Sequence, residues 1–140
     1  MRYLGLDLGS KTLGVSISDA SGIIASSYGI IRHDEDYSGL IGEIAKIVEE
    51  KKIEEIVLGL PKNMNGSLGE KANLSYKFKD MIESNLGIKV NLVDERLTTK
   101  QATDLLISND TSRKKRKKVI DSMAACIILQ SYLDIKERKL

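Results

Sequence analysis

Residues 2–18 read RYLGLDLGSKTLGVSIS, and this stretch decides which fold we expect. Two strand-like runs, Arg2–Asp7 and Gly14–Ser18, are separated by the turn sequence Gly9-Ser10-Lys11. The second run alternates apolar and polar residues, which is the period of a sheet with one wetter face. After another turn, Ile23–Ile31 reads as a third strand. The chain is therefore predicted to open as a three-stranded antiparallel meander.

Beyond residue 31 strands alternate with helical periods. Apolar residues recur at helical spacing from Leu40 to Val48, with charged residues on the opposite face. Gly87 is a natural C′ residue for the helix before it. The further predicted elements are a buried strand over 53–60, a helix over 70–86, a strand over 88–93, a helix over 98–110 and a buried helix over 119–133. This order predicts an α/β fold, in which a five-stranded mixed sheet, three antiparallel strands then two parallel ones, has helices on both faces.

The bulk properties indicate one soluble domain over residues 1–140. No apolar run is long enough to span a membrane, and we expect no signal peptide because the first strand starts at once. Cys126 is the only cysteine, so an internal disulfide is excluded, and a reducing cytoplasm fits. Cys126 is predicted to be a buried structural thiol. The single histidine, His33, lies in a polar stretch and is predicted to be a solvated loop residue rather than a catalytic one. A His-rich zinc site is excluded, because zinc sites draw on Cys and His.

Three acids directly follow or interrupt apolar runs: Asp7, Glu95 and Asp121. Acids seldom lie buried unless they are paired or bound to a metal. The predicted topology gathers these three at one edge of the core, where they would form an all-oxygen site for a hard divalent cation such as Mg²⁺. Alternation places Asp7 on the same face as Gly5 and Gly9, whose missing side chains would leave room for a ligand. With cations nearby, the pattern points to metal-dependent phosphodiester cleavage.

Each acid also has a structural alternative. Asp7 could cap the turn that follows it, and Glu95 could form a surface ion pair with Arg96, which would contribute little. Asp121 could be the N-cap of the last helix, a position that favours Asp. The three together carry more weight than any one, because clustered carboxylates repel one another unless a cation is present.

The run from Arg113 to Lys118 is six consecutive cations, and mutual repulsion predicts a mobile loop there. Such a loop could simply be solvated, but beside an acidic site it would gather phosphates, with an affinity that falls steeply with salt. The Asn-rich loop after Pro61 could be turn chemistry or could contact substrate. Aromatic residues are few, so sequence-specific base reading has no support. The candidate substrate-binding residues are Lys11, Asn63, Asn65, Arg96, Lys100, Arg113, Lys114 and Arg116.

Over essentially its whole length the chain resembles the YqgF/RuvX family, RNase H-like proteins described as pre-16S rRNA nucleases and Holliday junction resolvase homologues. The resemblance rests on four motifs in order: Leu6–Gly14, Gly59–Ser67, Asp94–Thr99 and Asp121–Ala125. It implies an RNase H-like fold and a bacterial cytoplasmic protein that acts in maturation of the 5′ end of 16S rRNA. It also implies that Asp7, Glu95 and Asp121 are the catalytic acids.

The leading hypothesis is a nuclease in which Asp7 bridges two Mg²⁺ or Mn²⁺ ions, with Glu95 and Asp121 completing their shells. The ions would activate a water for in-line attack and stabilise the leaving oxygen, while Lys11 or Arg96 offsets charge on the phosphoryl oxygens. The substrate would be pre-rRNA or branched DNA, with ribosome association, and the protein would be a monomer or a homodimer. The alternatives are a Holliday-junction-type DNA resolvase, a non-catalytic RNA-binding ribosome-assembly factor, and one lobe of a phosphotransferase, because residues 7–12 also resemble the phosphate loop of actin-like ATPases and sugar kinases.

Overall fold

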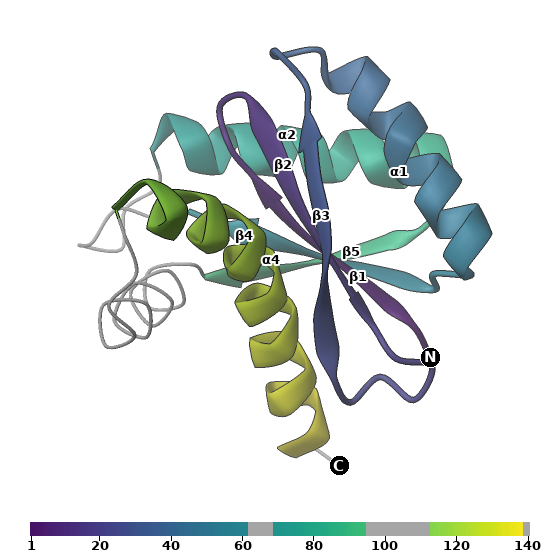
Figure 1. The fold of residues 1–140 in the computed structure, drawn as a ribbon. Helices are drawn as coiled ribbons and strands as arrows, with labels where there is room; N and C mark the ends of the chain where they lie inside the picture. Colours follow the sequence, from purple (N-terminus) through teal and green to yellow (C-terminus); the bar gives the residue numbers. More distant parts are fainter. Residues whose placement is uncertain (62–68, 95–112, 139–140) are drawn as a thin grey trace.

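The computed structural model describes residues 1–61, 69–94 and 113–138, and for 113–122 and 137–138 it describes the main chain alone. The described strands form one sheet in the order β3-β2-β1-β4-β5 (Figure 1). The strands are β1 (Tyr3–Leu8), β2 (Thr12–Ser18), β3 (Ala25–Arg32), β4 (Glu55–Leu60) and β5 (Lys89–Asp94). The helices are α1 (Tyr37–Lys51), α2 (Glu70–Leu86) and α4 (Arg113–Arg138). The helix predicted over 98–110 lies outside the described residues.

The strand pairing confirms the predicted mixed sheet. β2 is antiparallel to both β1 and β3, and β4 and β5 continue the sheet on the other side of β1 as parallel strands. Several boundaries differ from the prediction by a few residues: β3, for example, begins at Ala25 rather than at residue 23, and β4 begins at Glu55 rather than at residue 53. Ile53 instead closes the end of α1: Lys52 adopts a left-handed conformation, and the Ile53 N–H donates to the Val48 carbonyl at 3.0 Å.

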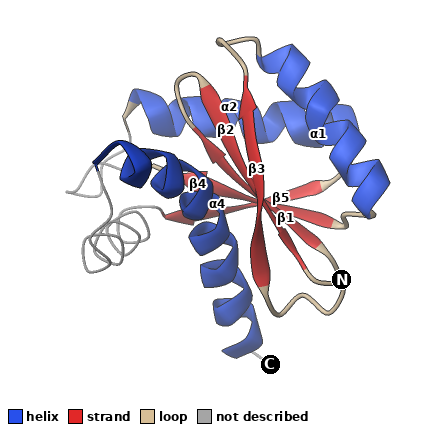
Figure 2. Ribbon diagram, in the orientation of Figure 1, coloured by secondary structure: helices blue, strands red, loops and turns tan. Residues whose placement is uncertain are grey.

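The helices cover both faces of the sheet, as predicted (Figure 2). On one face α1 and α2 bury a large apolar core against inward residues of β1, β2, β4 and β5, including Leu4, Leu6 and Leu58. On the other face α4 packs Ile128, Leu129 and Leu133 against Tyr3 and Val57. Alternate residues of β1 therefore belong to opposite cores, which fixes the direction of every side chain on this strand.

Local signals set the ends of the first two helices. Asp36 is the N-cap of α1, where its Oδ1 accepts from the Gly39 N–H at 3.1 Å. Gly87 ends α2 with φ 62°, a left-handed conformation that favours glycine, and its N–H donates to the Glu83 carbonyl at 3.0 Å. The prediction of a helix over residues 70–86 that is closed by Gly87 is confirmed.

The start of the last helix corrects a prediction. Its main chain is helical from Arg113, so the expectation of a mobile loop over the cationic run, with a helix only from 119, is wrong. Like charges at helical spacing cost only about 0.2–0.5 kcal/mol per pair, Lys and Arg are good helix formers, and extending an existing helix avoids the cost of nucleation. Within the span predicted to be buried, the described side chains from Met123 to Leu133 are buried or partly buried, and the first exposed ones are Asp134 and Ile135. No described helix is both long and apolar enough to cross a membrane.

Candidate functional site

Asp7 lies near the carboxyl end of the central strand β1, opposite Gly14 of β2. Its side chain is half-buried. Among the described residues its carboxylate forms no hydrogen bond or ion pair, and the turn after it is closed without it, by the Gly9 N–H donating to the Thr12 carbonyl at 2.8 Å. The described part of the chain thus gives no support to the alternative that Asp7 caps this turn.

Asp7 belongs to the face of the sheet that α4 covers. Alternation along β1 puts Asp7 on the same side as Tyr3 and Gly5, and Tyr3 packs in the α4 core. At Gly5 the helix lies so close that an added Cβ would come within 2.8 Å of the Leu129 Cβ and 3.0 Å of the Ala125 carbonyl oxygen. The expectation that Gly5 leaves room for a ligand is therefore wrong: the space is filled by α4 and by the Ser16 hydroxyl of β2.

A buried hydrogen bond fixes the position of α4 along β1. The Ser16 hydroxyl of β2 donates to the Ala125 carbonyl at 2.7 Å, next to Gly5. This carbonyl lies within a helix, so the bond holds one turn of α4 at one level of the sheet. Its length and burial make it a strong constraint on the helix register.

The direction of α4 follows from a second contact. Tyr3 stacks on Tyr132 with ring centroids 5.7 Å apart, and the Lys136 ammonium lies 4.7 Å from the centroid of the Tyr3 ring. Moving along β1 from Tyr3 to Gly5 therefore corresponds to moving back along α4 from Tyr132 to Ala125. Two residues further along β1, about 6.6 Å, the strand reaches Asp7. One turn further back along α4, about 5.4 Å, the helix main chain reaches Asp121.

The other predicted site residues differ in what the structure describes of them. Glu95 comes directly after β5, whose last residue, Asp94, pairs with Leu60. Glu95 and four of the candidate substrate contacts lie outside the described residues: Asn63, Asn65, Arg96 and Lys100. Arg113, Lys114 and Arg116 have a helical main chain at the start of α4. Of the three predicted metal ligands, only Asp7 is described with its side chain, and within the described residues no group of three or more His, Cys, Asp or Glu could hold a metal ion.

Lys11 is exposed in the hairpin turn that follows Asp7. Its carbonyl accepts from the His33 N–H at 2.9 Å, so β3 holds the main chain of the turn. The exposed ammonium of Lys11 remains available to a phosphate.

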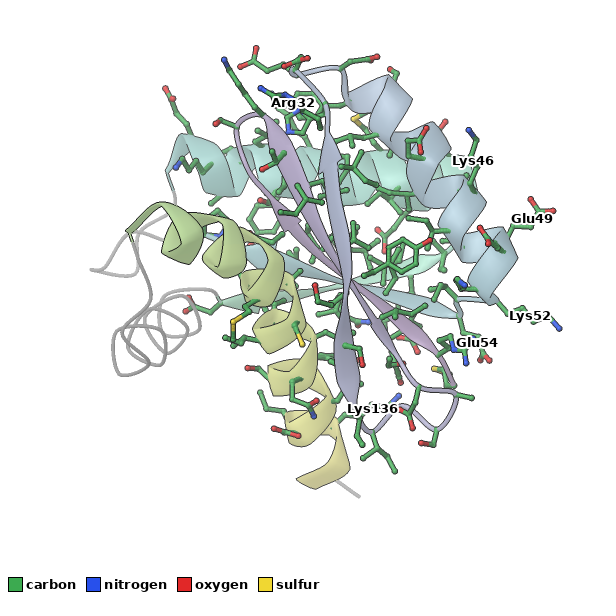
Figure 3. All side chains as sticks on the ribbon, viewed as in Figure 1. Arg32, Lys46, Glu49, Lys52, Glu54 and Lys136 are labelled. Carbon is green, nitrogen blue, oxygen red and sulfur yellow. The ribbon has the colours of Figure 1, made fainter. Side chains whose placement is uncertain are left out.

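His33 is the main site-adjacent residue that sequence reasoning missed, because it is buried rather than solvated. Its Nε2 hydrogen-bonds to the Gly9 carbonyl at 2.9 Å, and its Nδ1 accepts from the Glu35 N–H at 2.8 Å. The end of β3 can be found in Figure 3 by its labelled last residue, Arg32, which directly precedes His33. Strand alternation could have found this residue, since His33 is two positions after Ile31, which packs against the α1 side of the core.

Cys126 is partly buried on α4, and its thiol donates to the Ala25 carbonyl at 3.5 Å. Burial raises the pKa of this thiol, which lowers the fraction of reactive thiolate. The environment fits the predicted structural role.

A mixed sheet whose first three strands are antiparallel, with an open carboxylate on its central strand, defines a protein with the RNase H-like fold. The solved structure of Thermus thermophilus RuvC in complex with a Holliday junction substrate has this fold, with a TM-score of 0.61 at 12% identity over 98% of this chain and 96% of that one. A ROK hexokinase from Thermus thermophilus matches at a TM-score of 0.50 and 19% identity, over 71% of this chain but 35% of that one.

Sequence comparison then specifies the family. Residues 1–135 match the family described as "RuvX: Holliday junction resolvase", and the chain belongs to this family. A relative from Oceanobacillus iheyensis, named "Putative pre-16S rRNA nuclease", is 51% identical over 137 residues, which cover 97% of this chain and 100% of that protein.

Proposed function

We propose that this chain is a metal-dependent nuclease, a hydrolase of phosphodiester bonds in structured nucleic acid, that acts in maturation of the 5′ end of pre-16S rRNA. It would work as a single domain over residues 1–140, in the cytoplasm, as a monomer or a homodimer and in association with the ribosome. Membership of the RuvX family and full-length identity of about half to a relative with a nuclease name support this proposal.

The observation that carries the proposal is the state of the Asp7 carboxylate. It is half-buried and has no partner among the described residues. Partial removal of a carboxylate from water costs free energy unless another charge compensates it. A divalent cation with oxygen ligands would provide that compensation, so the residue at this position fits a metal ligand.

The remaining ligands would come from the neighbouring elements. Asp7 is level with Gly59 and Val93 in the parallel strands, so alternation carried past Val93 would put Glu95 on the α4 side with Asp7. Asp121 lies one helical turn before Ala125, the residue that Ser16 fixes. We propose that Asp7, Glu95 and Asp121 together hold Mg²⁺ or Mn²⁺, with two ions in the full site. When bound, such ions lower the pKa of a coordinated water and stabilise charge at phosphorus.

The protein residues would bind and orient the substrate around this centre. Lys11 is exposed on the turn after Asp7 and would pair with a phosphate near the scissile bond, and Arg96 would add a second positive charge. The cationic run has a helical main chain, and Arg113, Lys114 and Arg116 would supply positive charge to a nucleic-acid backbone. Asn63, Asn65 and Lys100 would add contacts from the loops beyond the strand ends.

The test is a cleavage assay with a precursor of 16S rRNA that carries its 5′ leader, with and without Mg²⁺. Asp7→Asn keeps the shape of the side chain and removes its charge, so cleavage should fall by more than about a hundredfold, beyond what losing a partner of a metal ligand costs. The matched control is Asp80→Asn, at an exposed position of α2, which should cleave as the wild type does. Full activity of Asp7→Asn protein would remove the proposal.

A second candidate is a Holliday-junction-type DNA resolvase, which the description of the family and the fold of RuvC favour. The same enzyme preparation should be tested on a four-way DNA junction. Faster cleavage of the junction than of the rRNA precursor, lost in Asp7→Asn protein, would replace the substrate in our proposal and keep the chemistry.

Two non-nuclease functions have clear signatures. A non-catalytic assembly factor would bind RNA in EDTA in a salt-dependent way and would not cleave it with any divalent ion. A phosphotransferase lobe would bind ATP saturably in calorimetry; the hexokinase likeness spans about a third of that enzyme and supports the fold alone.

A further inference from the structure

His33 holds the turn after Asp7 through two of the carbonyl groups of that turn. Its ring Nε2 hydrogen-bonds to the Gly9 carbonyl at 2.9 Å, and its main-chain N–H donates to the Lys11 carbonyl at 2.9 Å. The turn lies between these two acceptors and otherwise contains the exposed Ser10. One buried residue of β3's end thus determines how this turn is oriented.

The hydrogen-bond network fixes the tautomer of His33. Nδ1 accepts from the Glu35 N–H at 2.8 Å, so this nitrogen carries no proton. In a neutral imidazole the other nitrogen then carries it. His33 is therefore the donor to the Gly9 carbonyl, through Nε2–H.

The position of the ring decides which way the Gly9–Ser10 peptide faces. His33 stacks against Tyr37, 5.4 Å between centroids, and Tyr37 packs on Phe78, 6.2 Å away, in the core under α1 and α2. The Gly9 carbonyl therefore points toward the α1 side. In a trans peptide the N–H points opposite to the carbonyl, so the Ser10 N–H faces the other side, on which Asp7 lies. Within the described residues this N–H donates to no group.

We propose that His33 is a positioning residue that aims the Ser10 main-chain N–H at a phosphate oxygen of the substrate beside Asp7. A main-chain N–H held at a fixed angle is a good ligand for a phosphate, because it loses little freedom on binding. The inference rests on the proposed nuclease function for the identity of the substrate. It adds a residue and a donor that the acids and the cations do not supply.

The chain conformation after His33 supports a specific role for its ring. Asp34 and Glu35 have φ angles of 44° and 67°, a left-handed conformation that non-glycine residues adopt at a cost. The strained segment delivers the Glu35 N–H to Nδ1, and the Asp36 N–H donates to the His33 carbonyl at 2.8 Å. A purely apolar packing role would not require this donor, whereas fixing one tautomer does.

The first test reads the free protein by NMR. His33 is the single histidine of the chain, so its ring nitrogens give one unambiguous set of signals in a long-range proton–nitrogen correlation spectrum. We expect a proton on Nε2 and none on Nδ1, as the hydrogen bonds of the ring require. A proton on Nδ1 would overturn the proposal.

The second test follows the Ser10 amide during titration with a twelve-nucleotide single-stranded RNA in EDTA, where cleavage is suppressed. The wild-type Ser10 amide proton should shift downfield as a phosphate accepts from it. His33→Gln keeps a donor at about the reach of Nε2 and should retain the shift. His33→Phe keeps an aromatic ring beside Tyr37 without any donor and should lose it; the same shift in His33→Phe protein would overturn the proposal.

The third test separates binding from chemistry in the cleavage assay. Loss of one hydrogen bond to a charged phosphate corresponds to about a tenfold change, so His33→Phe should raise KM about tenfold and leave kcat within about twofold. His33→Gln should restore KM. If His33 had a structural role alone, both variants would lose stability in urea unfolding and the folded enzyme would keep its KM.

The outcomes distinguish this proposal from the proposed function. The tautomer and the Ser10 shift are measured without turnover, so a protein that binds RNA through Ser10 and never cleaves would contradict the nuclease and keep the His33 inference. An active nuclease whose Ser10 amide does not respond to RNA would support the nuclease function and contradict the His33 inference.

Discussion

Two turns at opposite ends of β2 treat their acids differently. In the turn between β2 and β3, the Asp19 carboxylate accepts from the Ser21 hydroxyl and from the N–H groups of Ile23 and Ile24. Near the end of β1, before the turn to β2, the Asp7 carboxylate accepts from no described residue, and His33 holds that turn instead. The structural acid is satisfied by its own turn, whereas the acid that we propose as a metal ligand accepts no hydrogen bond from the described residues.

The sharpest way to break this comparison is to neutralise each acid in turn. Asp7→Ala should lose more than about a hundredfold in cleavage, and in metal-free buffer it should unfold at the same or a higher urea concentration, because an unpaired carboxylate near the core is removed. Asp19→Ala should keep its activity and unfold more easily. Cleavage rates and urea midpoints of the two proteins test this: Asp7→Ala should lose activity and keep stability, and Asp19→Ala should keep activity and lose stability. Equal effects of both substitutions on activity would contradict it.

The position of α4 against the Asp7 face is the next feature to test. Gly5→Ala puts a Cβ into the space that the Ser16 hydroxyl of β2 and Leu129 and Ala125 of α4 occupy, and overpacking of this kind costs about 1–3 kcal/mol. Gly29→Ala is the matched control, because an added Cβ there meets nothing within 4 Å. Urea unfolding should show the loss for Gly5→Ala alone. An unchanged midpoint for Gly5→Ala would mean that α4 does not lie this close to β1.

Metal binding should sharpen the difference between the two acids. An ion that binds the folded protein alone stabilises it by about 2.7 kcal/mol at a hundred times its Kd. Mg²⁺ or Mn²⁺ should therefore raise the Tm of the wild type and of Asp19→Asn protein, and should have little effect on Asp7→Asn. Thermal unfolding with and without EDTA checks this. A rise in Asp7→Asn protein equal to that of the wild type would place the ion elsewhere.

The smallest expected effect is on the pH dependence of stability. The hydrogen bond from Ser21, followed by those from the Ile24 and Ile23 N–H groups, holds the pKa of Asp19 well below its usual range. A depressed pKa contributes stability above the unfolded-state value, and this contribution is lost as pH falls through the folded-state value. The difference in Tm between wild type and Asp19→Asn should therefore be largest near neutral pH and shrink in acid. A difference that is constant with pH would contradict the role of the Asp19 charge.

The parts of the fold that were predicted correctly depend on local sequence. The meander and the helix over 70–86 follow from alternation, helical period and the glycine at position 87, each of which acts over a few residues. The position of Asp7 near the end of the first strand also follows from neighbouring residues alone. These features need no knowledge of distant contacts.

The parts that were not predicted depend on contacts between distant segments. A Cβ added at Gly5 would meet Leu129 and Ala125 of α4, which lie more than a hundred positions away in the sequence. His33 is buried because the turn at Asp34 and Glu35 folds it against Tyr37. The start of α4 at Arg113 was not predicted, because repulsion among the six cations favours a loop only when the helix that follows them is left out of account. Glu95 and its loop lie outside the described residues, so that part of the predicted site stays a prediction.

The Ser16–Ala125 hydrogen bond fixes where each turn of α4 lies along the central strand. Between residues 121 and 125, many substitutions would leave the spacing intact, but adding or deleting one residue would turn everything upstream by about 100° around the helix axis. Natural variation in this short interval should therefore consist of exchanges of residue type and never of changes in length.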